Sequence, residues 1–197
     1  MTLHDLLQAG ADDAIAIAAP GRTPLDYRGL RALVAATTAS LNAAGIGRND
    51  RVAIVLPNGP EMATCFVACA SAVTSAPLNP AYRGDEFEFY LDDLQAKALI
   101  VDRASTSPAV EAAKKLGVQV IELVVADGAA AGQFTLAAAA ATPSAHGGPS
   151  QAEDVAMVLH TSGTTSRPKR VPLSVANLCA SARQIAATLQ FTAQDRG

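Results

Sequence analysis

The residues with the most evident chemistry lie in one short stretch, 159–172, which reads Leu-His-Thr-Ser-Gly-Thr-Thr-Ser-Arg-Pro-Lys-Arg-Val-Pro. Hydroxyl and amide donors can bind the oxygens of a polyphosphate, and nearby cations offset its negative charge. Gly163 allows the backbone a close approach or a positive φ. The stretch therefore predicts a phosphate-binding loop, with hydroxyls from Thr161, Ser162, Thr164, Thr165 and Ser166 and cations from Arg167, Lys169 and Arg170.

This stretch differs from the Walker phosphate loop, Gly-x-x-x-x-Gly-Lys-Ser/Thr. It has one glycine, Lys169 is followed by Arg170, and three further residues precede the next helix start at Ser174. A helix N-terminus is therefore not the expected phosphate anchor, and hydroxyls, loop amides and Lys169 take that part. A simpler interpretation is a polar turn between two strands with Lys169 in solvent. That interpretation explains neither the Pro-Lys ending nor the upstream segments described next.

From Thr161 to Lys169 the pattern Thr-Ser-Gly-Thr-Thr-x-x-Pro-Lys resembles the phosphate loop of the adenylate-forming superfamily. This superfamily includes acyl-CoA synthetases, amino-acid adenylation domains and luciferases. Four upstream segments extend the resemblance in the family's order, namely Leu-Asp-Tyr-Arg-Gly-Leu at 25–30 and the segments 47–54, 57–61 and 76–80. Within the family, residues 160–173 are most similar to the oxalate–CoA ligase subgroup, mainly through Ser166, Arg167 and Pro172.

The resemblance implies an ATP-dependent acid–CoA ligase. A carboxylate oxygen attacks the α-phosphorus of ATP to give acyl-AMP and pyrophosphate, and the thiol of coenzyme A then displaces AMP. Donors fixed where negative charge develops lower the barrier of the first step. Mg²⁺ on the phosphate oxygens is also implied, with its protein carboxylate beyond Gly197, so no metal ligand is expected among these residues. The implied ligands of the β- and γ-phosphates are Thr161, Ser162, Gly163, Thr164, Thr165 and Lys169, with Lys169 as the catalytic cation.

In this family, the acyl-binding half of the large domain and a small C-terminal domain follow the loop. Their motifs do not occur in this sequence, so we expect residues 1–197 to be the N-terminal portion of the AMP-binding domain of a longer enzyme. The chain alone is then expected to be inactive and to need its C-terminal part, or another copy, over an open sheet edge. The acyl substrate stays open between oxalate and another small or fatty acid. The alternative is a nucleotide-binding or scaffold fragment that keeps the fold without catalysis.

The composition restricts the class of protein and the compartment in which it is expected. The chain has 197 residues, of which 50% are hydrophobic, so it can bury one core and is not disordered in bulk. Its net charge of −3 gives no reason to expect nucleic-acid binding. Three cysteines without a framework spacing favour a reducing compartment, for which we expect the cytoplasm and leave the peroxisome open. We find no apolar stretch long enough to span a membrane.

Strand and helix patterns alternate along the chain, which predicts an α/β fold with a largely parallel sheet. Residues 128–141 are rich in alanine, and residues 142–153 are rich in Pro, Gly and Ser, which predicts a loop between two parts of the sheet. The last predicted helix should bury Leu178, Ala182, Ile185 and Leu189. The predicted strands are 51–56, 98–101, 118–125 and 155–160, and the predicted helices are 26–44, 61–73, 85–94, 107–117 and 174–189.

Arg170 and His160, which flank the loop, each have two interpretations. Arg170 stands where many family members have glycine, and it would be strained if that position took a positive φ. It is either an extra cation for phosphate or a small dianionic acid, or a solvated side chain on a hairpin, which we favour. His160 either contacts the nucleotide or acyl group, or is a hydrogen-bonded, half-buried histidine, which we favour.

Two further groups could hold a metal, but each has a simpler interpretation. The pair Asp92–Asp93 is more typical of a solvated helix face than of a metal site. Cys65 and Cys69 lie four residues apart on a predicted helix, with no further His or Cys partners nearby in the sequence. Buried cysteines of this kind behave as small hydrophobic residues, and this is the interpretation we favour.

Overall fold

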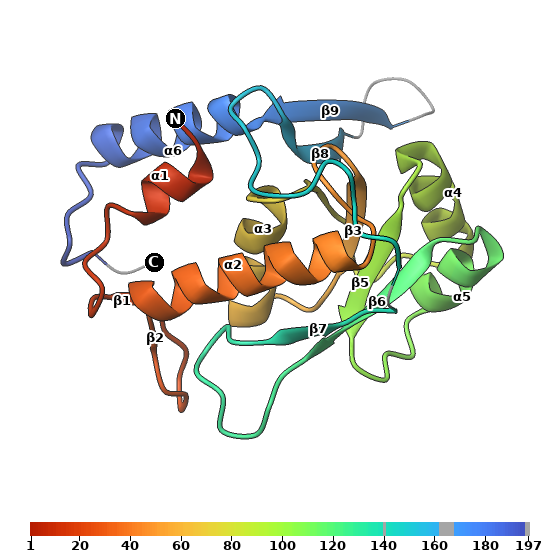
Figure 1. Ribbon diagram of the computed structural model, residues 1–197, viewed down its shortest axis with the longest axis horizontal. Helices are drawn as coiled ribbons and strands as arrows, with labels where there is room; N and C mark the ends of the chain where they lie inside the picture. The colour runs from red at the N-terminus through yellow and green to blue at the C-terminus, as the bar shows by residue number, and fades with distance from the viewer. Residues whose placement is uncertain (140, 162–167, 196–197) are drawn as a thin grey trace.

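A computed structural model describes residues 1–139, 141–161 and 168–195. Its centre is a seven-stranded sheet in the order β7-β6-β5-β3-β4-β8-β9 (Figure 1). The five inner strands are parallel, and the two outer strands run antiparallel to their neighbours. The strands are β3 (Arg51–Val55), β4 (Thr74–Pro77), β5 (Ala98–Asp102), β6 (Gln119–Val124), β7 (Thr135–Ala137), β8 (Val155–Thr161) and β9 (Lys169–Ser174).

Helices cover both faces of this sheet, which confirms the predicted α/β fold. One face carries α2 (Tyr27–Ala43) and α3 (Pro60–Ala70), and the other carries α4 (Gly84–Leu94) and α5 (Pro108–Lys115). The helix α6 (Val175–Thr188) packs beside β8 on the α3 side. Three short elements precede α2: α1 (Leu3–Leu7), which packs on α6, and the strands β1 (Ile15–Ile17) and β2 (Leu25–Asp26), which pair with each other.

The central strands are apolar at consecutive positions because both of their faces are covered. In β3 and β5, Ile54 and Ile100 join the core beneath α2 and α3, whereas Ala53 and Leu99 join the core beneath α4 and α5. All four side chains are fully buried. This arrangement explains why both strands are short apolar runs rather than alternating patterns in the sequence.

The helix α2 forms where its sequence pattern predicts it. The carboxylate of Asp26 accepts a hydrogen bond from the Gly29 amide at 2.7 Å, which caps the first turn. Gly45 follows the helix with φ of +82°, a conformation that glycine adopts without strain. Its buried face has the spacing of an amphipathic helix and consists of Leu30, Leu33, Val34, Thr37 and Leu41.

Residues 142–153 contain no helix or strand. Three backbone hydrogen bonds hold this segment close to the ends of α2 and α3: Ser144 N to Asn42 O at 3.0 Å, Arg48 N to His146 O at 2.9 Å, and Ser150 N to Ser71 O at 2.8 Å. The segment therefore runs back over the body of the domain before the chain enters β8.

The predicted buried face of α6 is wrong. Val175 and Cys179 are buried, whereas Leu178 is half-buried and Ala182 is exposed. Ile185 and Leu189 are 51% and 60% exposed. Helical spacing identifies the apolar side of a helix, but the neighbouring elements decide which part of that side is covered. Here α1, β8 and β9 cover the side of the first turns that carries Val175 and Cys179.

Three strands of the sheet were not predicted, for local reasons. Pro77 ends β4 and Pro172 lies within β9, and proline argues against a strand interior when only the sequence is available. Pro172 is tolerated because β9 is paired on one side only, to β8. The strand β7 has three residues and lies in the alanine-rich segment, so its pattern is too short to recognise.

The two neighbouring cysteines are structural, which confirms the favoured interpretation. Cys65 and Cys69 are fully buried on α3, and their sulfur atoms lie 4.0 Å apart. A hydrogen bond with Cys69 and burial raise the pKa of Cys65 well above its ordinary value, so this thiol stays protonated. Within the described ranges, no group of three or more His, Cys, Asp or Glu residues could hold a metal ion. No helix in those same ranges is both long and apolar enough to cross a membrane.

Candidate functional site

The predicted phosphate loop connects the two strands of the β8–β9 hairpin. In this hairpin Thr161 pairs with Lys169, His160 with Arg170, and Leu159 with Val171. Because β8 is parallel to β4, Thr161 lies at the carboxyl edge of the parallel sheet. Ligands of open α/β sheets bind outside this edge. The hairpin therefore holds the two ends of the sequence motif together at an edge suited to a ligand.

The structure describes two of the six predicted phosphate ligands. Thr161 and Lys169 are opposite each other in the hairpin, and both are exposed. The other predicted ligands, Ser162, Gly163, Thr164 and Thr165, lie outside the described residues.

Alternate residues of the hairpin point to opposite faces of the sheet, so His160 and Arg170 face away from Thr161 and Lys169. His160 and Arg170 both contact Asp93 near the end of α4. His160 Nε2 lies 3.0 Å from Asp93 Oδ2, and Arg170 Nε lies 3.3 Å from the same oxygen. Arg170 Nη1 also donates to the backbone oxygen of Asp93 at 2.7 Å. Both strands of the hairpin are thereby linked to one residue of α4.

These contacts correct two interpretations of the sequence. Asp93 does not lie on a solvated helix face but faces the hairpin, with 31% of its side chain exposed. Arg170 is not a free side chain, because it forms an ion pair with Asp93. It also lies in extended β9 and is not among the residues with positive φ, so it carries no backbone strain of that kind.

The interpretation of His160 as a hydrogen-bonded, partly buried residue is confirmed. Its side chain is 6% exposed, and the Tyr90 ring lies edge-on to it with a centroid distance of 4.7 Å. Tyr90 in turn stacks on Tyr82 at 4.8 Å. A hydrogen bond with Tyr82 and partial burial raise the pKa of Tyr90 to about 12, so this ring is neutral at physiological pH. The imidazole is therefore held between a carboxylate and an aromatic stack.

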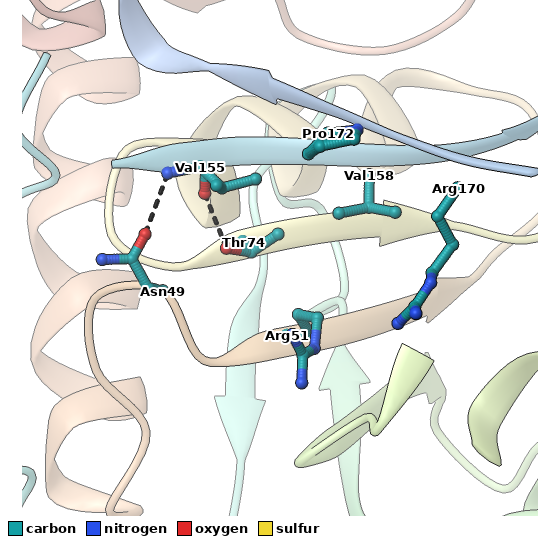
Figure 2. A pocket seen from close by; sticks show the side chains of 7 residues that line it. All are labelled: Asn49, Arg51, Thr74, Val155, Val158, Arg170 and Pro172. Atoms are coloured by element: carbon teal, nitrogen blue, oxygen red, sulfur yellow. Dashed lines mark hydrogen bonds between the residues drawn. The ribbon is translucent and has the colours of Figure 1, made fainter. Parts of the chain in front are cut away.

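A cavity of about 510 Å³ lies next to this cluster, on the sheet face that α4 covers. Figure 2 shows its lining side chains along the strands, with Asn49 at one end and Arg170 at the other. Two hydrogen bonds fix its wall: Val155 N donates to Asn49 Oδ1 at 2.9 Å, and Thr74 Oγ1 donates to Val155 O at 2.6 Å. This cavity was not predicted, because four strands that are distant in the sequence contribute to its lining.

The chain matches a known protein family. Residues 7–196 match the model of the family described as AMP-binding enzyme, so the chain belongs to that family. It is 38% identical to an oxalate–CoA ligase from Arabidopsis thaliana over 98% of this chain and 39% of the relative. It is 34% identical to an oxalate–CoA ligase from Saccharomyces cerevisiae over 76% of this chain and 32% of the relative. The chain thus spans less than half the length of these curated relatives.

Solved structures show the same relationship. The ATP-bound crystal structure of MatB from Rhodopseudomonas palustris superposes with a TM-score of 0.76 at 26% sequence identity. This match covers 98% of the present chain and 39% of the MatB chain. The family resemblance of the sequence and its α/β fold are both confirmed.

Proposed function

We propose that this chain forms the phosphate-binding part of an ATP-dependent acid–CoA ligase. In this proposal Thr161, Ser162, Gly163, Thr164, Thr165 and Lys169 bind the β- and γ-phosphates of ATP. Lys169 stabilises the charge that develops as pyrophosphate leaves the α-phosphorus under attack by a carboxylate oxygen. A positioned cation acts on such a step because the charge is larger in the transition state than in the ground state.

The β8–β9 hairpin is the observation that carries this proposal. Thr161 and Lys169 are paired and exposed at the carboxyl edge of the sheet, and the residues between them have the composition of a polyphosphate loop. Membership of the AMP-binding enzyme family and the similarity to an ATP-bound MatB structure support the nucleotide. Mg²⁺ on the phosphate oxygens and coenzyme A as the second substrate belong to the proposed reaction of the longer polypeptide.

We further propose a small dicarboxylic acid, oxalate, as the acyl substrate. Two relatives at 38% and 34% identity are named oxalate–CoA ligases. Ser166, Arg167 and Pro172 in and after the loop follow the same subgroup pattern. A fatty acid is the competing substrate, and the experiment below compares the two directly.

Carboxylate-dependent exchange between ATP and pyrophosphate, catalysed by the full-length polypeptide that carries this chain, tests the proposal. We expect exchange with oxalate and much less with a fatty acid. Lys169→Ala should lower kcat/KM for ATP by about 100-fold, because one positioned group that stabilises transition-state charge has an effect of this order. The chain of 197 residues alone should give no exchange.

Lys114→Ala is the matched control, because Lys114 is 62% exposed on α5 and forms an ion pair only one turn away, with Glu111. This variant should retain the exchange rate. Unchanged exchange in Lys169→Ala would contradict the role of the loop. A full-length polypeptide that binds ATP but shows no exchange with any carboxylate would favour the non-catalytic alternative.

A further inference from the structure

Asp93 connects both strands of the phosphate-loop hairpin to the end of α4. Its Oδ2 atom is within 3.0 Å of His160 Nε2 on β8 and within 3.3 Å of Arg170 Nε on β9. Its backbone oxygen, one of the last carbonyls of α4, accepts a hydrogen bond from Arg170 Nη1 at 2.7 Å. A cation at this place also interacts favourably with the helix dipole. One residue therefore fixes the strand that enters the loop and the strand that leaves it.

The surroundings restrict the movement of these groups. His160 is almost fully buried, and the edge-on contact with Tyr90 fixes one side of its ring. The Asp93 side chain is 31% exposed and that of Arg170 is 47% exposed, so the ion pair lies at the boundary with solvent. Hydrogen bonds to a carboxylate are shorter and stronger than those between neutral groups. The buried histidine is thus the anchored end of the contact, and the arginine is its outer end.

The contact of Asp93 with the hairpin lies one residue pair away from the two ends of the loop. His160 and Arg170 are cross-strand partners, and the next pair along the hairpin is Thr161 with Lys169. Successive pairs in an antiparallel ladder alternate between hydrogen-bonded and non-hydrogen-bonded pairs, and they follow one continuous twist. Fixing the His160–Arg170 pair therefore fixes the separation and direction of the backbone at Thr161 and Lys169, without any contact between Asp93 and the phosphates.

We propose that Asp93 is a positioning residue for ATP, which acts through His160 and Arg170 to fix the backbone at Thr161 and Lys169, the two ends of the phosphate-binding loop. This inference rests on the proposed function, because it assigns Asp93 to the same site. Groups already held in their binding geometry do not lose further conformational freedom when the ligand arrives. Removing the Asp93 carboxylate should accordingly weaken ATP binding and leave the affinity for the carboxylic acid nearly unchanged.

The test measures steady-state ATP–pyrophosphate exchange in the full-length polypeptide, at a temperature well below every variant's melting point. We expect Asp93→Ala to raise KM for ATP at least about tenfold while KM for oxalate changes less than about twofold. Asp93→Asn keeps the size of the side chain and one acceptor for His160, so it should restore part of the ATP affinity. Asp92→Ala is the matched control, because it removes the neighbouring exposed carboxylate from the same helix.

A second readout does not depend on catalysis. Amide hydrogen exchange in β8 and β9 should become faster in Asp93→Ala and stay unchanged in Asp92→Ala. If Asp93→Ala lowers only the melting temperature and leaves KM for ATP at the wild-type value, Asp93 has a structural role alone and the inference is overturned. Failure of the proposed function gives a different pattern, since Lys169→Ala would then also leave exchange unaffected.

Discussion

Two aspartates beside β8 have different environments, and these decide what each can do. Asp93 lies at the solvent boundary between α4 and the hairpin, whereas Asp154, just before β8, is 6% exposed. The carboxylate of Asp154 accepts hydrogen bonds from Arg48 Nε at 2.6 Å, from Asn49 Nδ2 at 2.8 Å and from the Gln151 amide at 2.7 Å. These contacts join the start of β8 to the turn that precedes β3.

Asp154 should make the stability of the fold depend on pH. The hydrogen bond from Arg48 is the largest cause that holds the pKa of Asp154 below its ordinary value, although burial acts in the opposite direction. Since the folded pKa is lowered, the stabilisation is fully present above the ordinary carboxyl pKa of about 3.9. It is lost as the pH falls below that value and through the folded pKa.

We therefore expect Asp154→Ala to lower the free energy of unfolding at neutral pH by about 2–3 kcal/mol, because it removes a buried carboxylate that accepts several hydrogen bonds, one of them from the partly buried Arg48. Urea unfolding as a function of pH measures this loss, which should shrink in acid as the wild-type carboxylate becomes protonated. Glu111→Ala, which removes an exposed ion pair with Lys114, should change stability by less than about 0.5 kcal/mol. Equal effects of the two variants at neutral pH would contradict this account.

At the scale of elements, the irregular segment 142–153 approaches the body of the domain closely at Gly47. A Cβ atom added to Gly47 would lie 2.2 Å from Ser144 Oγ and 2.7 Å from the backbone oxygen of His146. The glycine therefore allows this segment to pass close to the turn before β3. The composition of the segment predicted a loop, but not that this loop packs against Gly47.

Gly47→Ala should destabilise the fold by about 1–3 kcal/mol, because the added methyl group must displace the backbone of His146 as well as the side chain of Ser144. Gly59→Ala is the control, since Gly59 has extended backbone and no atom within 4 Å of an added Cβ. We expect a clear decrease in melting temperature for the first variant and little change for the second. A Gly47→Ala protein that melts with the wild type would show that the segment moves aside at little cost.

At the scale of the whole molecule, the described surface leaves large apolar side chains uncovered at and after the end of α6. Ile185, Leu189 and Phe191 are 51%, 60% and 58% exposed, and the first two lie one helical turn apart. Neighbouring exposed apolar groups of this kind favour association with another surface. The isolated chain should accordingly associate through this region.

Ile185→Lys should reduce that self-association without lowering stability, because an exposed side chain contributes little to the core. Light scattering and sedimentation of the chain at several concentrations measure the effect. Gln184→Lys adds the same charge at an exposed neighbouring position and should leave association nearly unchanged. If both variants reduce association equally, the effect is due to net charge and not to the apolar surface.

Local patterns in the sequence were sufficient to predict much of the fold. The buried stripe of α2, the apolar runs of β3 and β5 and the glycine that follows α2 are short-range features, since each depends on residues within a few turns of one another. The phosphate motif was readable for the same reason, as its hydroxyls, glycine and lysine are consecutive or nearly so. These features indicated an α/β domain with a polyphosphate loop, and the family match agrees with that class.

Contacts between residues on different elements of the sheet and its helices could not be predicted from local patterns. Asp93 and His160 are 67 residues apart, and they meet because α4 lies over the sheet face to which His160 points. The exposure of Ile185 likewise depends on which elements reach the end of α6. By itself the sequence determined the kinds of elements and the chemistry of the loop, because both are properties of neighbouring residues. Only the tertiary structure decided which side chains contact the strands on either side of that loop, because strand order and helix placement bring distant residues together.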